Sequence, residues 1–106
     1  MSVTAASILA ILLFQAGQIK VHRDLRYHDG PDAHPRKHLL DLYLPASVSD
    51  CPVIMFVHGG AWTRGDKDGY GDAYGKMGSS FAQQGVAVAV INYRLSPEVK
   101  HPEHAR

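Results

Sequence analysis

The fold is decided by the stretch Val53-Ile54-Met55-Phe56-Val57-His58-Gly59-Gly60-Ala61-Trp62, in which five apolar residues run into His-Gly-Gly, a small residue and an aromatic residue. The apolar run predicts a strand buried on both faces. The glycines after it allow a sharp turn and leave main-chain N–H groups uncovered by side chains. Fixed N–H groups at the end of a buried strand can stabilise a developing oxyanion, although a strand that simply needs a glycine turn would have the same pattern.

Size and charge limit what the chain can be. It has 106 residues, of which 45% are hydrophobic and 20% charged, as expected for one small soluble domain or part of a larger one. The formal net charge is +1 and no basic stripe is present, so the charge gives no case for nucleic acid. The single cysteine, Cys51, excludes an internal disulfide, and nothing nearby in the sequence would activate it as a nucleophile.

Residues 1–18 form an apolar N-terminal segment built around Ile8–Phe14. The block is too short for a stable membrane span, which takes about 20 residues, and its length suits a secretory signal. Ala16 would serve at position −1 of a cleavage site, but Phe14 at −3 is too bulky and no Lys or Arg precedes the block. A signal peptide would make the protein secreted or periplasmic. The alternatives are a helix packed on a cytoplasmic domain or a membrane anchor.

Residues 19–106 are predicted to form the folded domain. Apolar and polar residues alternate over 19–27 and again over 38–44, with turn-forming residues between, which indicates an antiparallel strand pair at a sheet edge. A helix is expected over 72–84, capped by Asp72, followed by a second continuous apolar strand over 86–91. Strand, helix and strand of this kind form a parallel, right-handed βαβ unit, and the fold class is therefore α/β.

Two further expectations concern the helix and the end of the sequence. Tyr74, Met77 and Phe81 share one helical face at spacings of three and four, and Gly85 ends the helix. Pro102-Glu103-His104-Ala105 has the pattern of the first turn of another helix. A parallel sheet with two apolar faces needs helices on both sides, so we expect an apparently truncated domain, incomplete within these residues.

The glycine-rich loop could also be interpreted as a phosphate site. Residues 60–65 have the glycine spacing of a P-loop, but Asp66 stands where the motif needs lysine, and Lys67 comes one place late. A dinucleotide fingerprint fails because Gly75 is one place too far from the Gly69-Tyr70-Gly71 pair. We therefore expect no nucleotide cofactor.

Metal and nucleophile motifs are equally incomplete. Asp66-Lys67-Asp68 begins like a calcium loop, but Tyr70 and Met77 occupy ligand positions. The pairs His34/His38 and His101/His104 lack the cysteine or carboxylate that would complete a metal site. Gly78-Ser79-Ser80-Phe81-Ala82 resembles a nucleophile elbow, but it falls inside the predicted helix, so Ser80 is predicted to be structural. The sequence indicates no metal and no cofactor.

Four segments in order carry a resemblance to a known family: His58–Trp62, Gly65–Lys67, Asn92–Pro97 and His101-Pro102. Together they resemble the N-terminal part of an α/β-hydrolase, in the carboxylesterase branch that includes hormone-sensitive-lipase-like, acetyl- and feruloyl-esterase-like enzymes and kynurenine formamidases. The resemblance covers about residues 19–106. It implies that the strand over 86–91 lies between the strand over 53–57 and the antiparallel pair.

The resemblance also implies roles for individual residues. The loop after the strand would be the oxyanion loop, with the N–H groups of Gly60 and Ala61 as donors and Gly59 making the turn. His58 would brace the loop through a side-chain hydrogen bond, and Trp62 would lie beside the pocket for a small-molecule ester substrate. Arg94 would tie the loop after its strand through an ion pair.

The family's serine nucleophile, acid and histidine all come after the oxyanion loop, and none is found in these 106 residues. We therefore expect a fragment of a serine carboxylic-ester hydrolase that supplies the oxyanion loop and is inactive alone. The alternative is a non-catalytic module derived from the same fold, which binds a ligand or partner at the glycine loop. The sequence leaves the oligomeric state open.

Overall fold

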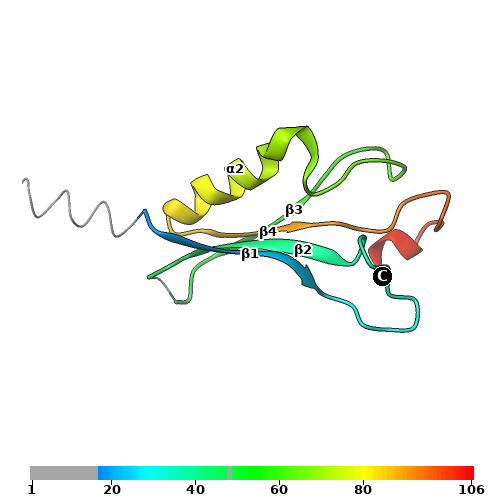
Figure 1. The fold of residues 1–106 in the computed structure, drawn as a ribbon, viewed down its shortest axis with the longest axis horizontal. Helices are drawn as coiled ribbons and strands as arrows, with labels where there is room; N and C mark the ends of the chain where they lie inside the picture. The colour runs from blue at the N-terminus through cyan, green and yellow to red at the C-terminus, as the bar shows by residue number, and fades with distance from the viewer. Residues whose placement is uncertain (1–16, 48) are drawn as a thin grey trace, which may run out of the picture.

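The computed structural model describes residues 17–47 and 49–106. The predicted signal or anchor in residues 1–18 falls almost wholly outside the described residues. Among the described residues, no helix combines the length and apolar composition that crossing a membrane requires. The elements, in chain order, are β1 (Ile19–Arg26), β2 (Leu39–Pro45), β3 (Val53–Val57), α2 (Gly69–Gln83), β4 (Ala87–Ile91) and the short 3₁₀ helix η1 (Glu103–Ala105) (Figure 1).

The four strands form one mixed sheet in the order β1-β2-β4-β3. β2 pairs antiparallel with both β1 and β4, whereas β3 pairs parallel with β4. This confirms the predicted antiparallel pair, the βαβ unit and the place of β4 between β3 and the pair. The loops after β3 and β4 and the loop between β1 and β2 gather at one end of the sheet (Figure 1).

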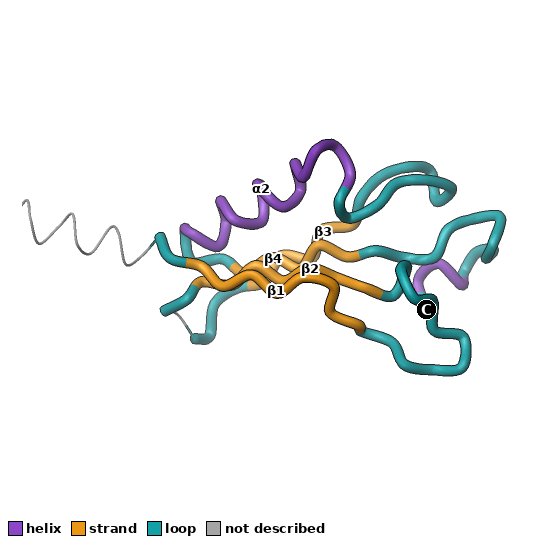
Figure 2. Tube along the Cα trace, in the orientation of Figure 1, coloured by secondary structure: helices purple, strands orange, loops and turns teal. Residues whose placement is uncertain are grey.

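The core lies between the sheet and α2, which covers one face (Figure 2). Tyr43 of β2 is its centre, with Val88, Val90 and Ala82 also buried. α2 lies close to the sheet because glycines occupy the face of the helix that contacts it. A methyl group on Gly78 would lie 2.6 Å from the Tyr43 ring, so the close fit of helix on sheet depends on the missing side chain.

The prediction that β3 is buried on both faces is wrong for these residues. Val53 is 64% exposed, Met55 66% and Val57 47%. β3 pairs with a strand on one side only, and within the described residues no helix lies along the sheet face opposite α2 (Figure 2). The same pattern of unbroken apolar residues does correspond to burial in β4, where residues 87–90 are all buried. The exposure of β3 and the burial of β4 therefore follow from their positions in the sheet and not from the apolar character that they share.

The start of α2 differs from expectation, and its predicted apolar face is confirmed in part, since Tyr74 and Met77 pack against the core. The helix begins at Gly69 after Asp68, and residues 70–72 have left-handed backbone angles, with φ of +66° at Asp72. Asp72 therefore does not cap the helix. Its carboxylate instead accepts two hydrogen bonds of 3.3 Å from Arg23 of β1. Phe81 is 40% exposed, because the buried stripe of α2 follows its small residues, Gly75, Gly78 and Ala82.

Candidate functional site

The loop after β3 turns through three successive residues with positive φ. The angle is +132° at Gly60, +55° at Ala61 and +64° at Trp62. A side chain on Gly60 would collide with the carbonyl oxygen of Arg64, so glycine is required there. Gly59, expected to make the turn, has neither a positive φ nor a neighbour that a methyl group would meet. The conformation that needs glycine thus lies one residue later than predicted.

Hydrogen bonds to one carbonyl hold the turn. The Gly60 carbonyl oxygen accepts from the Thr63 N–H at 3.1 Å, the Arg64 N–H at 3.2 Å and the Thr63 hydroxyl at 3.1 Å. This arrangement fixes the peptide plane between Gly60 and Ala61. The N–H groups of Gly60 and Ala61 have no acceptor within the described part of the chain. The Ala61 N–H is therefore a fixed donor, and both N–H groups are free to donate a hydrogen bond to a ligand.

His58 braces the beginning of the loop from inside. Its side chain is 2% exposed, its Nδ1 lies 2.8 Å from the Gly59 carbonyl oxygen, and its ring stacks on Tyr93 with centroids 4.4 Å apart. Because a carbonyl oxygen only accepts, Nδ1 carries the proton. Nε2 is buried with no partner in the described residues. The buried ring in this position can hold the loop but does not reach the exposed side, where a catalytic base would act.

The segment after β4 holds the loop at three places. The Tyr93 hydroxyl donates to the His58 carbonyl at 2.7 Å. The Ser96 N–H donates to the Trp62 carbonyl at 2.8 Å, and the Lys67 N–H donates to the Asn92 side-chain oxygen at 2.7 Å. The beginning, middle and end of the loop are thus each bonded to residues 92–96. Two sequence motifs that are 30 residues apart form one structural unit.

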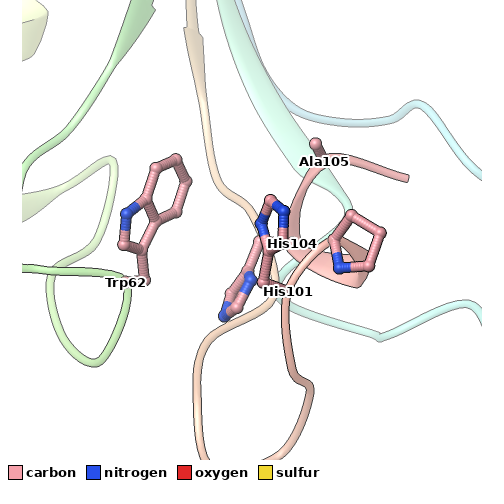
Figure 3. Close-up of a pocket in the computed structure, with 5 residues that line it drawn as sticks. Trp62, His101, His104 and Ala105 are labelled. Carbon is pink, nitrogen blue, oxygen red and sulfur yellow. The ribbon is translucent and has the colours of Figure 1, made fainter.

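Trp62 forms one wall of a pocket of about 270 Å³. It is 55% exposed, and its ring centroid lies 5.5 Å from that of His104, which comes from the C-terminal segment (Figure 3). Nε2 of His104 lies 2.9 Å from the Ser96 hydroxyl. His101, Pro102 and Ala105 complete the lining. The pocket therefore lies between the glycine loop and the C-terminal segment, and its walls are largely apolar.

Comparison with known proteins identifies the family. Residues 40–106 match the BD-FAE family, which is more than half of the chain. The chain belongs to the BD-FAE family. This is an esterase family of the α/β-hydrolase fold, and the predicted fold class and family resemblance are confirmed.

Relatives of the BD-FAE chain are hydrolases. It is 37% identical over 81 residues to the isoprenylcysteine α-carbonyl methylesterase ICME of Arabidopsis thaliana, covering 74% of this chain and 17% of that one. It is 45% identical over 53 residues to the kynurenine formamidase of Meyerozyma guilliermondii, covering 48% and 18%. The crystal structure of esterase B from Lactobacillus rhamnosis superposes with a TM-score of 0.63 and 26% identity, covering 93% and 32%. The chain thus spans less than a quarter of the length of either curated relative.

In this BD-FAE domain the far end of the glycine loop rests on an ionic cluster whose cation is buried. The Lys67 side chain is fully buried, and its Nζ lies 2.7 Å from Asp41 Oδ1, 2.7 Å from Asp24 Oδ1 and 3.2 Å from Asp68 Oδ1. Burial alone would lower the pKa of the ammonium, but hydrogen bonds to the three carboxylates raise it above the ordinary value. Lys67 is therefore charged at neutral pH, and its carboxylate partners compensate for the burial of its ammonium.

Asp66 connects this cluster to the β1–β2 loop. Its carboxylate accepts hydrogen bonds from the Arg36 guanidinium at 2.6 and 3.2 Å and from the Asn92 amide at 3.0 Å. Burial would raise the pKa of this carboxyl, but these bonds and one from the Asp68 N–H hold it well below its usual range. Asp66, which occupies the position where a P-loop needs lysine, thus links the glycine loop to the β1–β2 loop.

Arg94 ties the neighbouring segments, and the predicted ion pair is confirmed. Its guanidinium lies 3.3 Å from Asp32 Oδ2 and donates to the carbonyl oxygens of Glu103 and Arg106 at 3.0 and 3.1 Å. It is 7% exposed and does not line the Trp62 pocket. Within the described residues no cluster of three potential ligands could hold a metal ion. The contacts of Asn92 and Lys67 could not be predicted from the sequence, because no linear pattern pairs these two residues.

Proposed function

We propose that the whole protein is a serine carboxylic-ester hydrolase and that residues 19–106 supply its oxyanion loop. In this reaction a serine hydroxyl attacks the ester carbonyl carbon and the carbonyl oxygen becomes an oxyanion. The N–H groups of Gly60 and Ala61 would donate hydrogen bonds to that oxygen. The nucleophile, acid and base would lie beyond residue 106, so these residues would be inactive alone.

One observation carries the proposal: the turn at Gly60–Trp62. Backbone strain of this kind costs of order 1–3 kcal/mol per residue and persists where the surroundings over-determine it. Here two adjacent non-glycine residues have positive φ, and the donors that the turn presents have no acceptor in the described residues. Fixed donors aimed at a developing charge are the largest single contribution to catalysis in many enzymes. The hydrolase relatives support the same reaction class.

The substrate class is a small-molecule carboxylic ester. A pocket of about 270 Å³ beside Trp62 suits a short acyl or alcohol group, and its apolar walls would exclude water from it. Esterase B from Lactobacillus rhamnosis has also been crystallised inhibited by a tributyrin phosphonate, which mimics a short-chain ester. Trp62 would contact the group next to the scissile carbonyl.

A first test reads the gene downstream of codon 106. We expect a further strand followed by a Gly-x-Ser-x-Gly turn within about 80 residues, since this turn presents the nucleophile in the fold. A reading frame that continues without such a turn would contradict a serine mechanism.

A second test removes one proposed donor from the complete enzyme. Replacing Ala61 by lactic acid turns its amide into an ester and deletes the N–H with little change in shape. Proline is unsuitable, because it requires a negative φ and Ala61 has +55°. We expect kcat for a short-chain p-nitrophenyl ester to fall about 10²–10³-fold, with KM little changed. The same replacement at Ala33, in the β1–β2 loop, is the control. Equal kcat in both variants would refute the role of Ala61.

A further inference from the structure

We propose that Lys67 is a positioning residue for the oxyanion loop, which its buried ammonium anchors through Asp41 and Asp24. The expected effect of Lys67 on catalysis rests on the proposed function, whereas the anchoring of the loop does not depend on that function. Lys67 stands where the loop ends and α2 is about to begin. Its main-chain N–H bonds to Asn92 and its side chain to the aspartates, so both its backbone and its side chain are fixed.

A β-bulge between β1 and β2 lies next to this lysine. The pairing of β1 with β2 shifts register between His22 and Leu25, and Asp24 in the bulge has a φ of +58°. The Asp24 N–H donates to Asp41 Oδ1 at 2.9 Å while its own carboxylate reaches Lys67. Bulges redirect side chains out of the regular strand alternation. The bulge in β1 therefore brings the Asp24 carboxylate to the same ammonium that Asp41 of β2 contacts.

Lys67 can affect the position of the glycine loop because the two ends of this loop pack against each other. Gly65, two residues before Lys67, packs so tightly that a methyl group on it would lie 2.5 Å from both the Gly59 oxygen and His58 Nδ1. Any movement of Lys67 therefore displaces the backbone that packs against His58 and Gly59. The left-handed residues at 61 and 62 lie within this closed loop. Displacement of about 1 Å in a catalytic group can cost about 10²-fold in rate, so the anchor matters to the donors although it does not touch them.

Amide hydrogen exchange in the complete protein tests the anchoring directly. The Arg64 N–H bonds to Gly60 O and the Ser96 N–H bonds to Trp62 O, so both report the position of the loop. In Lys67→Met we expect these two amides to exchange about tenfold faster, while amides of β4 keep their protection. Lys76→Met, which removes an exposed lysine from α2, is the matched control. Lys67→Arg should recover part of the protection, because it restores the charge.

Asp24→Asn gives a milder perturbation, because Asp24 lies at the half-exposed rim of the cluster and Lys67 keeps Asp41. We expect faster exchange at Arg64 and Ser96 in this variant too, by a smaller factor. Unchanged exchange at both reporters in Lys67→Met would overturn the proposal. Uniform loss of protection along β4 and α2 in both variants would also overturn it, because Lys67 would then support the whole domain rather than position the loop.

Kinetics of the complete enzyme separate this inference from the proposed function. An oxyanion loop that loses its position should lose kcat about 10²-fold with KM changed little, because the oxyanion forms only in the transition state. If exchange at Arg64 and Ser96 rises but the complete enzyme hydrolyses no ester, the anchoring stands and the esterase assignment fails. If esters are hydrolysed and neither exchange nor kcat responds to Lys67→Met, the anchoring fails.

Discussion

Replacing Gly65 by alanine should damage the glycine loop far more than replacing Gly59, although both glycines belong to the same motif. Gly65 has a φ of +103°, and a methyl group there would lie 2.5 Å from both the Gly59 carbonyl oxygen and His58 Nδ1. Strained φ costs about 1–3 kcal/mol and overpacking about 1–3 kcal/mol more. The sum, roughly 2–6 kcal/mol, is a large part of the 5–15 kcal/mol that stabilises a typical domain.

Gly59 is the matched control. It has no positive φ, and a methyl group on it would meet nothing within 4 Å, so Gly59→Ala should change stability by no more than about 0.5 kcal/mol. Thermal and urea unfolding would be followed by the fluorescence of Trp62, the only tryptophan of the chain. Gly65→Ala should lower Tm by about 10 °C or more, since 1 kcal/mol corresponds to about 4–8 °C at this size. Equal melting of the two variants would refute the geometric reasoning.

Two further predictions concern α2 and His38. Gly78→Ala should destabilise by roughly 1–2 kcal/mol in urea unfolding, because a clash with the buried Tyr43 ring outweighs the gain of about 1 kcal/mol in helix propensity. Gly69→Ala, whose methyl group would lie 3.8 Å from Tyr74, should leave stability unchanged or improve it. Burial and the nearby Arg94 lower the pKa of His38, so the folded chain favours the neutral ring. Its stabilising contribution is complete above about pH 6.5 and is lost as the pH falls below that value towards the folded-state pKa. Melting curves between pH 8 and 5 should therefore show a smaller fall in Tm for His38→Gln than for the unaltered chain, and equal falls would contradict the assignment.

The antiparallel strand pair and the βαβ unit could be predicted from the sequence, because the residue patterns that indicate them are local. Alternating residues in 19–27 and 38–44 predict an antiparallel pair, and continuous apolar runs around a helical period predict a βαβ unit. The order of the strands came from the family resemblance and is confirmed. Burial was less predictable. β3 and β4 are both unbroken apolar runs, yet of the two only β4 has a paired strand on both sides.

The helix shows how tertiary contacts override a local preference. Asp72 is a favourable capping residue by type, but the Arg23 guanidinium competes for its carboxylate and the backbone there is left-handed. Phe81 shares a helical face with Tyr74 and Met77, yet it remains exposed because Gly75 and Gly78 face Tyr43. A helix packs on a large aromatic ring with its smallest residues, so hydrophobicity alone correctly placed Tyr74 and Met77 against the core but misplaced Phe81.

The loop geometry was beyond sequence reasoning for a related reason. Glycine at 60 can be predicted to turn, but Ala61 and Trp62 intrinsically avoid positive φ. Their conformation is imposed from outside by bonds from Tyr93, Ser96 and Asn92 to three points of the loop. Each of these bonds is modest, about 0.5–1.5 kcal/mol net, but together they can offset the strain of two residues. The two motifs therefore depend on each other physically, because the segment after β4 supplies the restraints that the loop after β3 needs.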